Sequence, residues 1–381
     1  MRDPGVIEID ALVIGAGPVG LWQVFQLGLQ GIHAHVVDVL DEAGGQCIEL
    51  YPDKPIYDIP GLPHSTGREL TQRLLQQVAP FKPRFHFNQQ VSELNHQPDG
   101  RWLVSTGEQR FLTRTLFIAA GVGAFVPKEL KIDGLAGFTG TQLHYRLKTL
   151  GRQPGVLAAE CSAQVKEEPA GEGQREGDTE QSTLLQRRLA QRVVVIGGED
   201  AAVESAIALA IQDAQLTQSV TLVHRRDVLQ ASPEALEQLA ELRASGRIEF
   251  VAGQVTGIEV NSERLSAVIV NTPDNQSRTL PLDALLVCQG ISPKLGPIAN
   301  WSLAMERKQL SVDPASFATN APGIYAVGDI NTYPGKKKLI VCGFHEATLA
   351  AFSAAGYINP QTPEVLQYTT SSALLQQRLG V

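Results

Sequence analysis

The chain has 381 residues, of which 43% are hydrophobic, enough for two or three domains with cores of their own. Its formal net charge of −8 argues against a nucleic acid as the main partner, because nucleic-acid-binding surfaces are basic. No apolar run reaches the roughly 20 residues of a membrane-spanning helix, and the N-terminus shows no apolar core of a signal peptide. We therefore expect a cytoplasmic protein with no membrane segment.

The four cysteines are Cys47, Cys161, Cys288 and Cys342. Their positions show no paired spacing, so neither a zinc site nor a disulfide framework is indicated. A reducing compartment fits this pattern, and we expect no bound metal.

Near the N-terminus, a glycine-rich turn lies between an apolar strand and an apolar helix. Residues 11–14 predict the buried strand, and residues 21–29 predict the helix. Between them stand Gly15, Gly17 and Gly20, in the spacing G-x-G-x-x-G. Strand, turn and helix in this order are typical of a dinucleotide-binding unit.

Each residue of this turn has a physical role in such a unit. Gly15 allows the tight turn, Gly17 lets a pyrophosphate approach the backbone, and Gly20 lets the helix pack closely on the strand. Pro18 belongs to the same turn, and the N-terminus of the helix that follows faces the negative charge of the phosphates. Asp38 ends the next predicted strand, 18 residues after Gly20, where a carboxylate can bind a ribose hydroxyl. These residues predict a bound dinucleotide.

A segment near the C-terminus indicates which dinucleotide this is. Residues 323–329 read Gly-Ile-Tyr-Ala-Val-Gly-Asp, a short strand that runs into Gly-Asp. The segment resembles one found in two-dinucleotide flavoproteins, where the aspartate binds the ribityl chain of FAD. Asp329 therefore predicts FAD at the first turn; the alternative is an ordinary strand end capped by an aspartate.

A second turn of the same kind follows at residues 197–202, again between a predicted strand and a predicted helix. The next predicted strand, residues 220–223, ends in basic residues and not in an acid. Arginine at this place accommodates the 2′-phosphate of NADP, whereas an acid favours the 2′-hydroxyl of NAD. The alternative is a pair of solvated surface charges. The residues that we expect to bind NADPH are Gly197, Gly198, Asp200, Ala201, His224, Arg225 and Arg226.

Glu199 departs from the pattern, because it stands where the second glycine of the turn is expected. Its side chain would crowd the pyrophosphate, and its charge would repel a phosphate by about 4 kcal/mol at about 4 Å and an effective dielectric of about 20. The side chain can turn into solvent at a much lower cost. We expect weakened or altered nicotinamide binding.

The two turns predict two tandem Rossmann-like three-layer α/β domains, as in flavoproteins that bind two dinucleotides. Each unit closes with a strand that leads to a glycine, and the glycine- and proline-containing crossings that follow are interpreted as hinges. We expect a discontinuous FAD-binding domain, residues 1–121 plus 294–381, and an inserted NADP-binding domain, residues 122–293.

Within the second unit, the strand and helix pattern fails between residues 151 and 190. This stretch is polar, charged and rich in glycine, which predicts a disordered insertion with a short helix at residues 184–191. Nothing in it indicates a docking or regulatory role.

Several segments, in order along the chain, resemble one protein family. They are residues 44–52, 54–61, 121–125, 224–227 and 335–346, together with the two glycine-rich turns. The chain outside the insertion resembles the thioredoxin-reductase-like ferredoxin–NADP reductases. The resemblance implies electron transfer between NADPH and ferredoxin through bound FAD, in a homodimer. It implies no catalytic acid or base, since the cofactors carry the chemistry.

The resemblance also implies roles for single residues at the flavin. Tyr51 would stack on one face of the isoalloxazine ring. Thr370 would touch the flavin from the C-terminal tail, where Tyr368 stands in place of the histidine often found in the family. Asp38 would bind the adenosine ribose and Asp329 the ribityl chain. The residues implied to line the site are Gln46, Tyr51, Val91 and Phe125.

The same resemblance separates this chain from thioredoxin reductases, which carry a redox-active Cys-x-x-Cys pair. Residues 142–145 read Gln-Leu-His-Tyr in that neighbourhood, and the sequence contains no such pair. Transfer of electrons to a disulfide needs a dithiol. We therefore expect no such activity.

Docking of an acidic ferredoxin on an acidic chain would need a local basic patch. Lys336, Lys337 and Lys338 are the candidates, because they follow Asp329 closely in the sequence. A helix that starts near Gly343 would direct its positive end at the flavin.

Two other functions stay open. One is an NAD(P)H-dependent flavin diaphorase or oxidase that uses small acceptors, and the other is an FAD-binding sensor whose nicotinamide site has decayed. Glu199 keeps both open, and the insertion favours the second.

Overall fold

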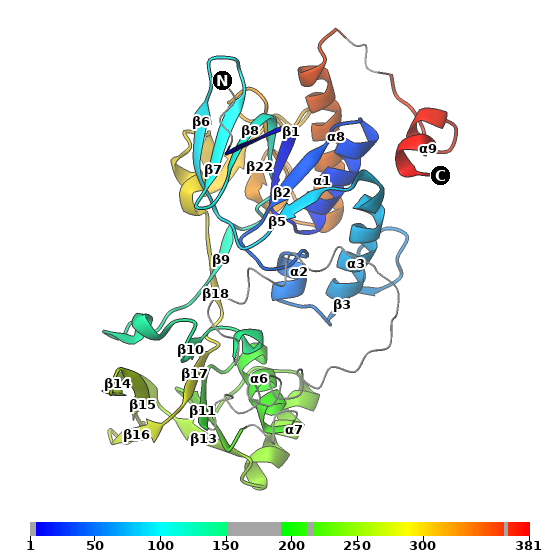
Figure 1. The fold of residues 1–381 in the computed structure, drawn as a ribbon. Coiled ribbons are helices and arrows are strands. Elements are labelled where there is room, and N and C mark those ends of the chain that lie inside the picture. The colour runs from blue at the N-terminus through cyan, green and yellow to red at the C-terminus, as the bar shows by residue number, and fades with distance from the viewer. Residues whose placement is uncertain (1–4, 151–191, 212–216, 362–364) are drawn as a thin grey trace, which may run out of the picture. The chain divides into compact units, whose positions relative to one another are not determined.

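The computed structural model describes residues 5–150, 192–211, 217–361 and 365–381 (Figure 1). The predicted insertion at residues 151–190, with Cys161, lies outside the described residues. The chain divides into two compact units, Met1–Ala124 with Pro293–Val381, and Phe125–Ser292. This division does not by itself assign a dinucleotide to either unit. No helix of the described ranges is long and apolar enough to cross a membrane.

The sheet of the first unit has seven strands in the order β5-β2-β1-β8-β7-β6, with β21 paired to β8. β1, β2, β5, β8 and β21 run parallel to one another, whereas β7 pairs in the antiparallel sense with both β8 and β6. The carboxyl ends of parallel strands meet at one edge, where ligands bind in such sheets. The strands are β1 (Val6–Ile14), β2 (Ala34–Val37), β5 (Arg84–His86), β6 (Val91–His96), β7 (Trp102–Thr106), β8 (Arg110–Ile118) and β21 (Ile324–Ala326).

Alternation along the parallel strands places apolar side chains on both faces of this sheet. Val13 and Val36 face the helices, while Leu12 and Ile14 face a layer of short strands and turns. Strands that are covered on both faces are almost wholly apolar, as residues 11–14 are. The covering elements are α1 (Pro18–Leu29), α3 (Gly67–Val78) and α8 (Ile340–Ile358) on one face, and η4 (Gly296–Asn300), β19 (Met305–Glu306), β20 (Gln309–Ser311) and β22 (Asn331–Thr332) on the other.

Shorter elements complete the first unit. The side chain of Thr66 accepts a hydrogen bond from the Glu69 backbone, and the Glu69 side chain accepts one from Thr66 N, which caps α3. β9 and β18 pair where the chain passes between the units. The shorter elements are α2 (Gln46–Glu49), β3 (Pro55–Ile56), β4 (Ser65–Thr66), η1 (Ala79–Phe81), β9 (Ala124–Pro127), β18 (Ile291–Lys294), η5 (Gly328–Ile330) and α9 (Ala373–Leu379).

The second unit repeats the three-layer plan with a five-stranded parallel sheet in the order β10-β17-β11-β12-β13. Helices α6 and α7 cover one face, and the antiparallel sheet β14-β15-β16 covers the other. Its elements are η2 (Leu135–Phe138), β10 (Leu143–His144), η3 (Leu147–Thr149), β11 (Arg192–Ile196), α6 (Asp200–Ile211), β12 (Ser219–His224), α7 (Pro233–Ala244), β13 (Ile248–Ala252), β14 (Gln254–Asn261), β15 (Arg264–Asn271), β16 (Ser277–Pro281) and β17 (Ala284–Val287).

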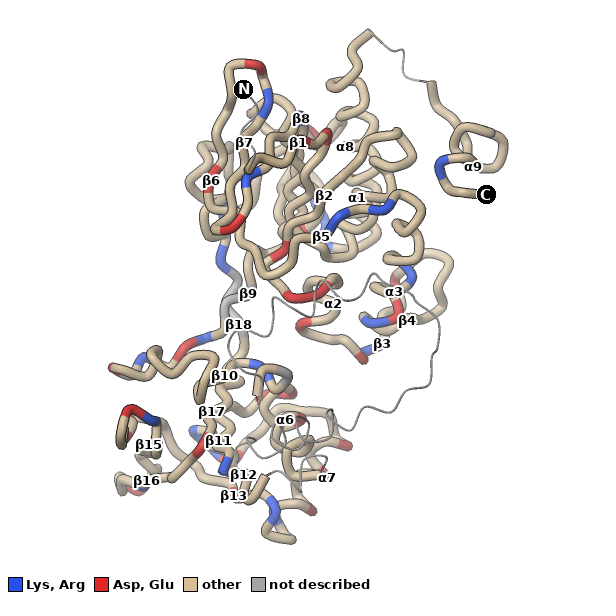
Figure 2. The backbone as a smooth tube through the Cα atoms, viewed as in Figure 1, with Lys and Arg blue, Asp and Glu red and all other residues tan. Residues whose placement is uncertain are grey.

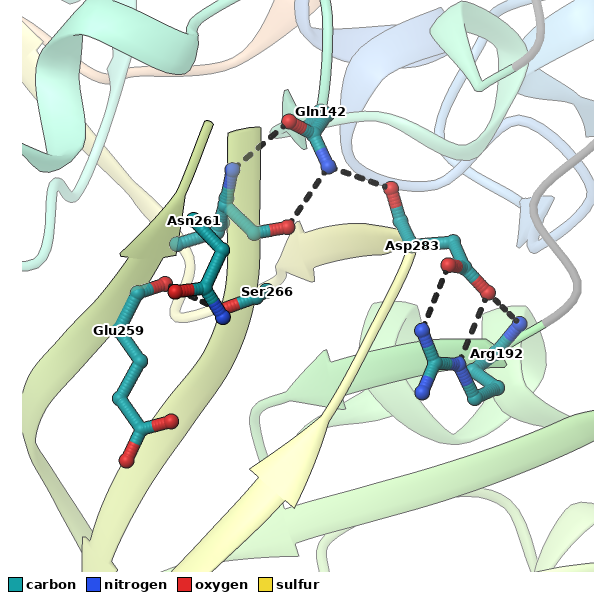
Figure 3. A network of polar contacts seen from close by, with 7 residues as sticks. Gln142, Arg192, Glu259, Asn261, Ser266 and Asp283 are labelled. Carbon is teal, nitrogen blue, oxygen red and sulfur yellow. Dashed lines mark hydrogen bonds and ion pairs between the residues drawn. The ribbon is translucent and has the colours of Figure 1, made fainter. Parts of the chain in front are cut away.

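A polar network ties the two sheets of the second unit together (Figure 3). The buried Gln142 amide donates to the Leu265 and Asp283 carbonyls at 2.9 and 3.1 Å and accepts from Leu265 N at 2.9 Å. Asp283 in turn pairs with the Arg192 guanidinium through two hydrogen bonds of 3.0 and 2.8 Å. These bonds anchor the start of β11, which carries the second glycine-rich turn at its other end.

Candidate functional site

The first glycine-rich turn lies at the carboxyl end of β1, and two of its glycines are required by packing. Gly15 has φ +107°, and a Cβ there would lie 2.4 Å from Ala119 O. A Cβ on Gly20 would lie 1.9 Å from Gly15 O, inside the helix–strand contact. At Gly17 the nearest atom is the Cα of Gly45, at 3.9 Å. The backbone at Gly17 is therefore the open part of the turn, where a phosphate could approach.

The helix that follows this turn has an uncapped N-terminus. Pro18 is its first residue, and Gly17 at the N-cap position has no side chain to accept a hydrogen bond. The first N–H groups of a helix lack partners within the helix, so an uncapped N-terminus suits an anion. This turn fits the pyrophosphate of a dinucleotide.

Asp38 follows β2 and is held by the same turn. One carboxylate oxygen accepts from Ala16 N at 2.6 Å and the other from Leu40 N at 2.8 Å. Asp38 thus lies next to the backbone of the turn, where a carboxylate can bind a ribose hydroxyl. Gln89 N donates to Asp38 O at 3.0 Å, which places Val91 two residues from this point. The Val91 side chain itself packs in the core and is 4% exposed.

Three segments far apart in the sequence meet around Gln46, at the start of α2. Gln46 Nε2 lies 3.5 Å from Asp329 Oδ2, at hydrogen-bond distance. A Cβ on Gly121 would lie 3.0 Å from the same nitrogen. Asp329 belongs to the turn Gly328–Ile330 that follows β21, and we call this the Asp329 turn. Gln46 and Asp329, both predicted to line one site, are thus brought together.

Tyr51 lies close to this group. Cys47 Sγ donates to its hydroxyl at 3.7 Å, and the raised pKa of Tyr51 has burial as its main cause, with smaller contributions from Cys47 and Asp329. Burial likewise raises the pKa of the Cys47 thiol. Both groups are therefore protonated at neutral pH, and Tyr51 is a neutral aromatic surface beside Asp329.

One residue of the expected site, Thr370, is not brought to this group. Thr370 is exposed and precedes α9, which packs on η1 and on α1. Arg378 of α9 donates to the carbonyl of Leu29, the last residue of α1, whereas the glycine-rich turn lies at the first residue. The side chain of Phe125 lies outside the described part of the structure.

A buried carboxylate that the sequence analysis did not single out holds the Asp329 turn. Glu346 of α8 is 0% exposed, and one of its oxygens accepts from Gly328 N at 2.7 Å and from Asn331 Nδ2 at 2.8 Å. Its other oxygen accepts from Tyr333 OH at 3.0 Å and from Lys336 Nζ. The available signal was a single acidic residue in an otherwise apolar helix, since such residues are rarely buried unless paired.

The prediction that Lys336 belongs to a basic surface patch is wrong. Its side chain is 7% exposed, and it pairs with Glu346 because the buried carboxylate needs a counter-charge. Lys337 and Lys338 are exposed. Basic and acidic residues are interspersed over both units (Figure 2).

The second glycine-rich turn, at the end of β11, is also closely packed. A Cβ on Gly197 would lie 2.2 Å from Cys288 O, and one on Gly198 would lie 2.5 Å from His224 Nδ1. The imidazole of His224, at the end of β12, therefore rests on the backbone of the turn. Asp200 begins α6, and Ala201 is exposed in its first turn.

The basic residues after β12 differ in ion pairing from the acid that follows them. Asp227 is paired with Arg243 through hydrogen bonds of 3.0 and 2.9 Å. Arg225 and Arg226 are exposed, and neither forms an ion pair with any residue that the structure describes. Burial, followed by these two guanidinium groups, lowers the pKa of His224. Two positive charges thus stand beside the second turn without a protein counter-charge in the described chain.

Glu199 lies in the second turn with its carboxylate beside Gly290. A Cβ on Gly290 would lie 3.6 Å from Glu199 Oε2 and 3.7 Å from Lys128 Nζ. The backbone carbonyl of Glu199 accepts from Ala202 N and Val203 N, so the residue still starts the helix normally. The substitution of the second glycine therefore leaves the turn and the helix intact.

Comparisons with known proteins agree with this geometry. Residues 9–350 match the family described as pyridine nucleotide-disulphide oxidoreductase. The chain is 53% identical to a ferredoxin–NADP reductase of Paracidovorax citrulli (strain AAC00-1), covering 100% of this chain and 98% of that protein. It is 52% identical to a ferredoxin–NADP reductase of Acidovorax sp. (strain JS42), covering 98% and 95%.

Solved structures with the same fold are more distant. The thioredoxin reductase of T. acidophilum has a TM-score of 0.57 at 18% identity, covering 92% of this chain and 98% of that one. A bacillithiol disulfide reductase from Staphylococcus aureus has a TM-score of 0.56 at 15% identity, covering 91% and 97%.

The fold and the two glycine-rich turns define an α/β oxidoreductase of the type that uses two dinucleotides. The chain belongs to the pyridine nucleotide-disulphide oxidoreductases, and within them to the family of the ferredoxin–NADP reductases. The predicted fold class and the predicted family are confirmed.

Proposed function

We propose that this protein is a ferredoxin–NADP reductase, which transfers electrons between NADPH and ferredoxin through bound FAD. The observation that carries the proposal is the match to ferredoxin–NADP reductases over the full chain, at 53% identity for one relative. The two glycine-rich turns, one in each unit, support it independently. The sequence contains no Cys-x-x-Cys pair, so transfer to a disulfide is not proposed.

FAD is assigned to the first unit. The open backbone at Gly17 and the N-terminus of α1 would hold the pyrophosphate, and Asp38 would bind the adenosine ribose. Gln46 and Asp329 would hold the ribityl chain, with Tyr51 stacked on the ring. The wider set assigned to FAD is Gly15, Gly17, Pro18, Gly20, Asp38, Gln46, Tyr51, Val91, Phe125, Asp329 and Thr370.

NADPH is assigned to the second unit. Arg225 and Arg226 would hold the 2′-phosphate, because each guanidinium can donate two hydrogen bonds to it. Asp227 does not compete for them, since Arg243 already pairs with it. The wider set assigned to NADP is Gly197, Gly198, Asp200, Ala201, His224, Arg225 and Arg226.

The protein supplies position and electrostatics for this reaction, and the cofactors supply the chemistry. When bound, FAD would supply the chemistry that links a two-electron hydride donor, NADPH, to a one-electron acceptor, ferredoxin. The N-terminus of α8 has no side-chain cap, so its free N–H groups would stabilise negative charge on the ring. Tyr51, stacked on the ring, would exclude water from one of its faces.

We also propose that the enzyme works as a cytoplasmic homodimer. α9 packs at the far end of α1 from the first glycine-rich turn, so Thr370 would have to reach the flavin of a second copy. For ferredoxin, Lys337 and Lys338 remain as exposed positive charges close to the Asp329 turn.

The test is NADPH-dependent reduction of a ferredoxin by the purified holoenzyme under anaerobic conditions. We expect ferredoxin reduction with NADPH to exceed that with NADH at least tenfold. Equal rates with both nucleotides, with a small quinone as the better acceptor, would favour a diaphorase, the function that Glu199 keeps open. Bound FAD without reduction by either nucleotide would favour a sensor.

A further inference from the structure

A buried ion pair lies behind the Asp329 turn and touches neither of the residues assigned to the ribityl chain. Lys336 and Glu346 have side chains that are 7% and 0% exposed. Burying two opposite charges costs about as much as their attraction returns, so an apolar pair would stabilise the fold equally well. The pair therefore calls for an explanation other than stability.

The geometry shows what the pair fixes. Glu346 Oε2 accepts from Gly328 N at 2.7 Å, and Lys336 Nζ donates to Gly328 O at 2.9 Å. Both backbone polar groups of Gly328 are thus held by the two charged side chains. The Gly328 carbonyl belongs to the peptide bond that leads directly into Asp329, so this contact sets the orientation of Asp329.

Gly328 has a conformation that needs such support. Its φ is +79°, in the left-handed region, where the glycine backbone is also free to move. On its other side, a Cβ on Gly328 would lie 3.4 Å from Val19, in the first turn of α1. A Cβ on Gly343, in α8, would lie 2.4 Å from the same valine. The turn is therefore held between the start of α1, the start of α8 and the ion pair.

Two further donors complete the network. Asn331 Nδ2 donates to the same Glu346 oxygen as Gly328 N, at 2.8 Å. Tyr333 OH donates to the other oxygen at 3.0 Å. Glu346 thus accepts from four donors, all of which lie on the segment from Gly328 to Lys336. A carboxylate that accepts from four donors is fixed in a single orientation. A neutral amide could not replace it, because only one of its two polar atoms accepts hydrogen bonds and the other would meet a donor.

We propose that Lys336 and Glu346 are a positioning pair for flavin binding. They hold the Gly328 peptide so that the Asp329 carboxylate faces Gln46 Nε2 and the ribityl hydroxyls. The inference rests on the proposed function, in which FAD binds at Asp329. Neither residue touches the cofactor, so the pair acts through Asp329.

The test is the dissociation constant of FAD from the apoprotein, followed by quenching of flavin fluorescence on titration. We expect Glu346→Gln and Lys336→Met each to raise this constant at least tenfold, because each leaves a buried group without its partner. The double variant K336M/E346Q removes both charges. Its dissociation constant should not exceed that of the weaker-binding single variant, since the two effects share one interaction.

Controls separate positioning from general destabilisation. Asp283→Asn breaks the Arg192–Asp283 pair of the second unit and should leave the FAD dissociation constant within twofold of wild type. Thermal unfolding of every apoprotein is recorded in parallel. Lower unfolding temperatures with unchanged FAD affinity in Lys336→Met and Glu346→Gln would overturn the proposal. If Glu346→Gln does not fold, Lys336→Met and the neutral double variant decide.

FAD binding by the wild-type apoprotein separates a failure of the proposed function from a failure of the positioning pair. A wild-type apoprotein that binds no FAD overturns both the proposed function and this inference. A wild-type apoprotein that binds FAD, with single variants that bind it equally well, overturns only the positioning pair.

Discussion

Among single residues, Arg225 and Arg226, which follow β12, are the two that we propose select NADPH over NADH. Asp227 is neutralised by Arg243, whereas Arg225 and Arg226 face no counter-charge in the described chain. The sequence predicts this role, because a strand that ends in arginine is a local pattern. It could not show that the adjacent acid is paired with a helix 16 residues away.

Replacing both Arg225 and Arg226 with alanine should raise the dissociation constant for NADPH about 10- to 100-fold. Hydrogen bonds to a charged group contribute roughly 1.5–3 kcal/mol each, and exposure reduces this value. NADH has no 2′-phosphate, so its dissociation constant should stay within about twofold. Titration calorimetry with both nucleotides measures this, and Arg278→Ala, another exposed arginine of the same unit, is the matched control. An equal loss for NADH would contradict the assignment.

Glu199→Gly should strengthen NADPH binding by about 3- to 10-fold. The carboxylate lies beside Gly290 and near Lys128, so its repulsion of a phosphate is well below the roughly 4 kcal/mol of a direct contact. The same titration measures the change. If affinity is unchanged, the side chain has no influence on the pyrophosphate.

Among the elements, local patterns predicted the strands and helices around the two glycine-rich turns but not their full lengths. The strand expected at residues 11–14 begins at Val6, because residues 6–9 are not buried but still pair with β8. The helix expected near Gly343 begins at Ile340. The role of Lys336 was predicted wrongly because its partner, Glu346, lies on the next helix, and only the tertiary fold brings a counter-charge to a lysine.

Strands β2 and β5 carry a pair of histidines with consequences for stability. His35 Nδ1 and His86 Nε2 are 3.0 Å apart, a distance that requires a single shared proton. Burial, His86 and Arg84 lower the pKa of His35 to about 4, and burial and Arg84 lower that of His86. The unfolded chain therefore binds more protons than the folded one between about pH 6.5 and pH 4.

The stability of the first unit should therefore be fully present above pH 6.5 and fall as the pH drops towards 4. Each pKa unit corresponds to about 1.4 kcal/mol. Since both rings are only half-buried, we expect a loss of roughly 1–2 kcal/mol. Urea unfolding at pH 7 and pH 4.5 measures it, and His35→Gln should show a smaller difference between the two pH values. The same pH dependence in the variant would exclude this pair as its cause.

In the whole molecule, the first unit is built from two stretches of chain that are distant in sequence. Gln46 and Asp329 are 283 positions apart and still reach hydrogen-bond distance. No local pattern predicts such a contact. The expectation that Gln46 and Asp329 line one site came from the family resemblance. Neither the local pattern nor the resemblance gives the position of Thr370, since α9 packs at the far end of α1 from the first glycine-rich turn.

In the whole molecule, we propose that one chain holds two dinucleotides and that electrons pass between them. The most direct measurement is the absorbance of the bound flavin after anaerobic mixing with NADPH or, separately, NADH in a stopped-flow instrument. We predict rapid loss of flavin absorbance with NADPH and a loss at least ten times slower with NADH. Flavin that stays oxidised with both nucleotides would contradict this prediction, because a nucleotide bound at the second glycine-rich turn would then deliver no electrons to the flavin.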